Sequence, residues 1–196
     1  MKMAQLLLLL ISCAIAKAQV VSNNPSAPAL TNTLAIYLLA GARKPALEDN
    51  KLEPKPVLAD HDFVAYDTNT QRLAIRAEAA KRLCRGIKEK AGYTQPQFIE
   101  PRVRGDGRPS YGFDWPDTPF VLQALEERVC VGEFSSDLSS FLYDVPLIKP
   151  VKLFIHADST NDVQFRIENP RNDKRIIAAF ERLFQITNTP SKNTLK

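Results

Sequence analysis

The stretch PFVLQALEERVCVGEF, residues 119–134, decides the expected fold class. Phe120, Leu122 and Ala124 alternate with their neighbours, and Cys130, Gly132 and Phe134 alternate after a polar break. Such alternation is typical of strands with one face toward a core. A three-residue turn at 125–127 would place Leu122 opposite Cys130, with both side chains facing inward. The stretch therefore predicts a β-hairpin.

Outward from this hairpin, further short strands are expected on both sides. Residues 34–40, 62–67 and 72–76 are apolar or alternating runs bounded by turn-forming residues. Residues 151–156 and 163–168 predict a second hairpin around a polar turn. Residues 93–117 contain three glycines and four prolines, which interrupt regular structure, and are expected to be one long irregular loop.

Two helices are expected beside these strands. In residues 77–90, Ala80, Leu83, Cys84 and Ile87 form an apolar stripe with helical spacing. Asn169 as a cap and Pro170 as first helical residue open the second helix. Its expected core face is Ile176, Ile177, Phe180, Leu183 and Phe184. Together the elements predict an α+β fold, an antiparallel sheet with two main helices packed on one face.

The start of the chain predicts export. Lys2 precedes an apolar run over residues 6–16, and Ala16-Lys17-Ala18 has the small-x-small pattern of a cleavage site. We expect residues 1–18 to be a signal peptide, 19–33 a flexible tether, 34–186 one α+β domain and 187–196 a disordered tail. The apolar run is too short to span a bilayer. Cys13 in a lipobox-like context gives the alternative of a lipoprotein anchored through that residue.

Composition limits the partners. The chain has a net charge of +4, and Lys2 and Lys17 in the signal peptide supply two of its positive charges. Basic clusters occur near residues 81–90 and 102–108, but acids are interleaved throughout, and an exported protein rarely meets nucleic acid. We expect no nucleic-acid partner, no transmembrane segment in the mature chain and no cofactor.

Two cysteines remain after the expected cleavage, Cys84 and Cys130. Export exposes a protein to oxidants, and both residues are expected on inward faces, one on a helix and one on a strand. A helix-to-sheet disulfide is one interpretation, and two buried thiols that never meet is the other. Neither cysteine has the sequence context of a catalytic thiol.

The loop before the first hairpin holds the strongest candidate binding residues. These are Tyr111, Phe113, Asp114, Trp115 and Asp117. Aromatic rings supply contact area and carboxylates fix orientation, so an exposed loop of this composition suits a sugar or a peptide. The paired carboxylates also suggest glycoside hydrolysis. The alternative is that the loop folds back and buries its aromatic rings.

A second candidate cluster is Asp60, His61 and Asp62, followed by Asp67. These side chains offer oxygen and nitrogen ligands to a divalent metal. Adjacent residues of a strand point to opposite faces, however, and acids at the start of a strand commonly hold a turn. We therefore expect no metal site. His156 is expected at an exposed strand end.

Several stretches resemble a family of bacterial secreted proteins and lipoproteins that has no assigned activity. These are IYLL (36–39), PVLADHDFVAYD (56–67), LAIRAEAAKRL (73–83), PFVLQALEERVCVGEFSSDLSS (119–140), PLI (146–148) and NPRNDKRI (169–176). The resemblance implies no catalytic residue. Residues 56–134 are also similar to the periplasmic head subdomain of the SecD export subunit, which implies a ferredoxin-like arrangement.

The sequence favours a secreted or periplasmic, non-enzymatic protein that binds an envelope protein, a peptide or a glycan. The alternative is a small hydrolase of envelope polymers that uses Asp114 and Asp117, or a metal at Asp60, His61 and Asp62. A structural, stalk-like protein without a ligand is the third possibility.

Overall fold

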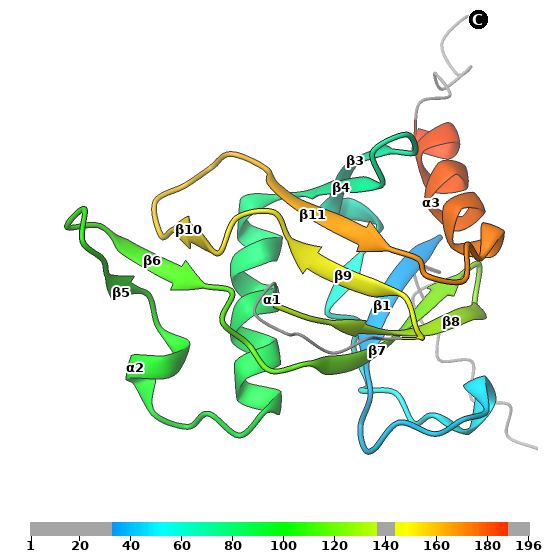
Figure 1. The fold of residues 1–196 in the computed structure, drawn as a ribbon, viewed down its shortest axis with the longest axis horizontal. Coiled ribbons are helices and arrows are strands. Elements are labelled where there is room, and N and C mark those ends of the chain that lie inside the picture. Colours follow the sequence, from blue (N-terminus) through cyan, green and yellow to red (C-terminus); the bar gives the residue numbers. More distant parts are fainter. Residues whose placement is uncertain (1–32, 137–143, 188–196) are drawn as a thin grey trace, which may run out of the picture. The chain divides into compact units, whose positions relative to one another are not determined.

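The computed structural model describes residues 33–136 and 144–187 (Figure 1). The predicted signal peptide, nearly all of the tether, and the predicted tail beyond Thr187 lie outside these residues. The first half of the described chain contains β1 (Leu34–Leu38), η1 (Leu47–Asp49), β2 (Leu58–Ala59), η2 (Asp60–Asp62), β3 (Phe63–Asp67), β4 (Arg72–Ile75), α1 (Ala77–Lys90) and α2 (Pro96–Ile99). The second half contains β5 (Arg102–Val103), β6 (Pro109–Gly112), β7 (Thr118–Ala124), β8 (Glu127–Phe134), β9 (Leu147–Pro150), β10 (Phe154–His156), β11 (Val163–Glu168) and α3 (Lys174–Thr187).

Strands form two sheets. An eight-stranded sheet has the order β2-β1-β7-β8-β9-β11-β4-β3, and a three-stranded sheet has the order β10-β6-β5. Every strand pair is antiparallel except β8 and β9, which run parallel. The large sheet is therefore mixed.

The two edges of the large sheet meet, which makes it nearly a barrel. Its edge strands β2 and β3 are consecutive in the chain, joined by the three residues of η2. The Asp62 carboxylate accepts a bond from Ala59 N–H at 3.0 Å, and the Asp62 carbonyl accepts one from Arg76 N–H at 2.9 Å. The Asp62 side chain thus caps the turn between β2 and β3, and its backbone extends the β3–β4 pairing by one residue.

The predicted fold class is wrong. The sheet is mixed and nearly closed, a second sheet is present, and the two long helices do not share one face of an antiparallel sheet. Helix α3 lies against β3, β8 and β1, whereas the main neighbours of α1 are β6 and α2. A ferredoxin-like arrangement is excluded for the same reason. Local patterns predicted most strands of the large sheet but carried no information about the order in which they pair.

The first hairpin follows its prediction closely. Leu122 lies opposite Cys130, as expected, and the register then shifts by one residue so that Gln123 faces Arg128. The turn is tighter than predicted, because Leu125 and Glu126 both adopt positive φ angles of 49° and 70°. The shorter turn leaves one extra residue in β8, and this residue forms a β-bulge.

The second hairpin does not form. Strand β11 pairs with β9 and β4, and β10 pairs with β6 of the small sheet. Residues 93–117 are also more ordered than expected, because they contain α2, β5 and β6. The β5–β6 hairpin supplies the partner that draws β10 away from β11 (Figure 1).

Helix α1 buries its predicted stripe, and helix α3 buries only part of its own, because Ile177 and Phe184 are half-buried. Helix α1 has the predicted bounds, and Ala80, Leu83, Cys84 and Ile87 are fully buried. Helix α3 begins later than predicted, at Lys174, because Asn169 instead caps a turn through its side chain to Asp173 N–H. Its buried face is Ile176, Ala179, Phe180 and Leu183.

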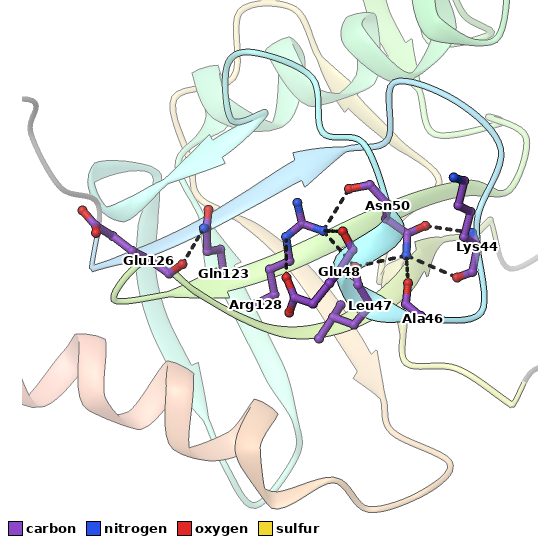
Figure 2. A network of polar contacts seen from close by, with 8 residues as sticks. All are labelled: Lys44, Ala46, Leu47, Glu48, Asn50, Gln123, Glu126 and Arg128. Atoms are coloured by element: carbon purple, nitrogen blue, oxygen red, sulfur yellow. Dashed lines mark hydrogen bonds and ion pairs between the residues drawn. The ribbon is translucent and has the colours of Figure 1, made fainter.

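A network of hydrogen bonds holds the loop between β1 and β2 against β8 (Figure 2). One guanidinium nitrogen of Arg128 donates to the carbonyls of Leu47, Glu48 and Asn50 at 2.8–2.9 Å. The buried Asn50 side chain bonds the backbone of Lys44 and further carbonyls of the same loop. These bonds satisfy the carbonyls left open around the short helix η1.

Candidate functional site

The aromatic residues of the predicted binding loop lie in the core. Phe113 is fully buried, Trp115 is 2% exposed and Tyr111 is 8% exposed. The Trp115 ring is stacked with Phe165 and makes an edge contact with Phe113 at a centroid distance of 5.0 Å. The loop has folded back, which is the alternative that the sequence left open. These rings form no exposed platform.

The two carboxylates of that loop lie in different surroundings. Lys88 Nζ of α1 binds Asp114 at 2.9 Å. Partial burial would raise the pKa of Asp114, but the hydrogen bond and charge of Lys88 outweigh it and hold the pKa below its ordinary value. Asp117 instead lies near Glu133 of β8, whose pKa is raised mainly by burial and also by Asp117. A depressed pKa at Asp114 opposes a role as general acid.

The carboxylates of the second candidate cluster are engaged in the fold. Asp60 accepts the backbone N–H groups of Thr33 and Leu34 at 2.7 and 2.5 Å. Asp62 accepts Ala59 N–H and binds Arg82 at 2.7 Å. Across residues 33–136 and 144–187, no group of three or more His, Cys, Asp or Glu side chains is placed to hold a metal ion.

The expected disulfide is absent from the structure, in which Cys84 and Cys130 are both buried, free thiols. Cys84 Sγ donates to the carbonyl of Gly112 at 3.0 Å, on the side of the small sheet. The charged groups nearest to Cys130 are Asp173 and Arg175, at the start of α3. Both residues face inward as predicted, but toward different elements. Burial raises the pKa of Cys84 to about 11 and that of Cys130 to about 12, so neither is a reactive thiolate.

A serine, a histidine and an aspartate lie in a row on the small sheet. Ser110 and His156 are direct cross-strand partners, and Ser110 Oγ lies 2.9 Å from His156 Nδ1. Asp106 Oδ2 lies 3.6 Å from His156 Nε2. Ser110 is only 2% exposed, so a substrate cannot reach its hydroxyl. The row is best explained as a polar cross-strand contact that holds β6 to β10.

A hollow of about 870 Å³ is lined by residues 151–156, 159 and 161–164. We refer to it as the β10–β11 hollow. Strands β9 and β11 remain paired as far as Pro150 and Phe165, and Val151 N–H still donates to Gln164 O at 2.9 Å. Beyond this bond the chain leaves β11 to pair with β6, and the residues that line the hollow come from both sides of this divergence.

Apolar side chains are exposed around this hollow. Val151, Leu153 and Phe154 are 40%, 46% and 37% exposed. Exposed apolar groups that gather at a concave surface commonly mark an interaction site. The sequence contains a signal for it: Leu153 and Phe154 are adjacent where a short strand begins, so in extended backbone they point to opposite faces and cannot both enter one core.

No protein-family model, curated protein or solved structure matches this chain. The fold and its contacts therefore carry the functional argument alone. None of the helices in the described part of the chain combines the length and apolar character needed to cross a bilayer.

Proposed function

We propose that this chain is a secreted or periplasmic, non-enzymatic binding protein that holds its partner in the β10–β11 hollow. The observation that carries the proposal is the exposure of Val151, Leu153 and Phe154 around a cavity of about 870 Å³. A volume of this size lies within the roughly 300–1,000 Å³ of ordinary ligand sites.

The hydrolase alternative has less support. Asp114 is paired with Lys88, and the carboxylates of Asp60 and Asp62 are occupied by backbone N–H groups. A general acid or a metal ligand must be free to exchange a proton or a bond during turnover. The hollow, in contrast, offers contact area and needs no rearrangement of these groups.

The extracytoplasmic location is proposed from the signal-peptide pattern of residues 1–18. An envelope protein or a peptide is the kind of partner this location supplies. Mass spectrometry of the mature chain after cell fractionation tests the location. A first residue of Gln19 supports export by ordinary cleavage, and an intact Met1 in the cytosolic fraction contradicts it.

Site-specific photo-crosslinking tests the binding site. A benzoylphenylalanine in place of Leu153 is expected to capture a discrete partner in intact cells. The same probe at Val64 of β3, which is 38% exposed, is the matched control. Capture at 153 and not at 64 supports the hollow as the site. Equal capture at both positions, or none, contradicts it.

A further inference from the structure

The free edge of β10 faces away from β6. Phe113 N–H donates to Leu153 O, and Ala157 N–H donates to Pro109 O, both at 2.8 Å. Because successive residues of a strand direct their backbone groups to opposite sides, the N–H and C=O of Phe154 point away from β6. Within the described residues β6 is the single strand partner of β10.

Strand β11 forms part of the opposite wall of the hollow, and its pairing with β4 holds it in place. Val163 and Gln164 pair with Ile75 and Ala74 of β4, so this wall is held while β10 is held by β6. The hollow is therefore a slot between two supported strands, with unpaired backbone groups on its β10 side. Free strand edges of this kind are the sites at which extended peptides add to a sheet.

Two cations flank the exposed apolar residues on the β10 side. The Arg104 guanidinium lies 4.4 Å from the centre of the Phe154 ring, and Lys152 is exposed next to Leu153. Neither cation has a carboxylate within ion-pair distance among the described residues. Asp162 contributes a negative charge from the β11 side of the slot. Charge complementarity thus favours acidic side chains in the part of a ligand beside β10.

We propose that the partner contributes an extended peptide segment, which pairs with the free edge of β10. Its acidic side chains lie beside Arg104 and Lys152, and its apolar side chains contact Leu153 and Phe154. This inference rests on the proposed function, because it specifies the ligand of the same site. A lipid surface or a glycan would use the apolar and charged groups but not the strand edge, so the edge favours a peptide.

Selection from a phage-displayed library of random dodecapeptides tests the chemistry of the ligand. On the full mature chain, we expect enrichment of peptides that alternate apolar residues with Asp or Glu. The double variant Arg104→Glu, Lys152→Glu is expected to bind a selected peptide about tenfold more weakly, since two rim contacts become repulsive. Lys55→Glu, at another exposed lysine, is the matched control and should leave affinity unchanged.

Backbone pairing is tested separately. Binding of a selected peptide should slow hydrogen exchange at the N–H groups of Phe154 and His156. Methylation of alternate peptide amides should abolish binding at one set of positions and leave it intact at the other. Uniform effects of methylation, or no acidic enrichment on the wild-type protein, overturn the proposal.

The result also separates this inference from the proposed function. Capture of a partner at position 153 without protection of Phe154 N–H in the captured complex leaves a binding protein whose ligand is not an added strand. Binding to vesicles of anionic phosphatidylglycerol, lost in the double variant, without any peptide enrichment would identify a membrane surface instead and contradict the peptide.

Discussion

Two places in this molecule interrupt the pairing of strands, and the chain treats them in opposite ways. Between β2 and β3 the carboxylates of the connecting turn bind backbone N–H groups: Asp60 binds those of Thr33 and Leu34 at the start of β1, and Asp62 binds that of Ala59. Between β10 and β11 the gap is left open and lined with exposed apolar side chains.

The difference teaches which acids are structural. Asp60 and Asp62 resemble a ligand set in sequence, but their oxygens accept backbone N–H groups at the start of β1 and the end of β2. No such carboxylate acceptor binds the Phe154 backbone at the open gap, so its backbone and apolar groups remain available to another molecule. We refer to the two places as the closed seam and the open seam.

The largest effect is expected from breaking the closed seam. Asp62→Ala removes an acceptor that is 3% exposed and leaves Ala59 N–H without its partner. We expect the free energy of unfolding to fall by about 3 kcal/mol in urea denaturation. Asp67→Ala is the control, because the hydrogen bonds of this exposed carboxylate stay within its own turn, and a clearly smaller loss is expected there. Equal losses would contradict a special role for the seam.

A milder change at the closed seam keeps its shape. Asp60→Asn retains one acceptor but turns an amide donor toward the N–H of Thr33 or Leu34. The expected loss is about 2 kcal/mol in the same assay, since one backbone donor is left unsatisfied. A change within error would show that these two bonds are not needed to hold β1 at the seam.

The reactivities of the two cysteines measure how readily the small sheet and the large sheet open locally. Cys84 bonds Gly112 of the small sheet, whereas Cys130 lies in the large sheet. Local release of the small sheet should expose Cys84 first, so we expect its alkylation in native buffer to be about tenfold faster than that of Cys130. Peptide mapping by mass spectrometry measures both rates. Equal rates would mean that the two sheets open as one unit.

Ionisation of the same two thiols makes the free energy of unfolding depend on pH. Their pKa values in the folded chain lie above the ordinary value of 9.0, at about 11 and about 12. Their neutral forms therefore stabilise the fold fully below pH 9, and this contribution is lost as the pH rises toward 11. Unfolding measured across this range should show less loss in Cys84→Ala than in the wild-type chain. Parallel curves would exclude the contribution of Cys84.

The smallest effect on stability is expected at the open seam. Leu153→Asp exchanges one exposed side chain for another, so the free energy of unfolding should change by less than about 0.5 kcal/mol. Partner capture, in contrast, should be lost. A large loss of stability would show that Leu153 supports the core and would weaken its assignment to a binding surface.

Local structure was predictable from sequence where one pattern dominated. The apolar stripe of α1 and the opposition of Leu122 and Cys130 follow from side-chain periodicity alone. The pairing of β10 was not predictable, because its alternative partners β6 and β11 are both short polar-apolar strands. Which strand pairs with β10 depends on β5 and β6. These two strands lie in a segment rich in glycine and proline, whose sequence does not indicate strands.

Local sequence patterns were also insufficient to predict the surroundings of the candidate site residues. Burial of Phe113 and Trp115 depends on Phe165, about fifty residues further along the chain, which no local pattern connects to them. The bonds of Asp60 also depend on Thr33 and Leu34, which lie 27 and 26 residues earlier in the chain. Sequence patterns identified the polar residues but could not tell a ligand set from a structural one.

Arg128 implies an order of folding. Its guanidinium joins the carbonyls of residues 47, 48 and 50 across 78 to 81 positions of the chain. Closing so long a loop is unfavourable until other contacts have shortened the distance, so these bonds form after the β7–β8 hairpin that carries the arginine. During synthesis, the loop between β1 and β2 leaves the ribosome early, but it can form these bonds only after Arg128 has emerged.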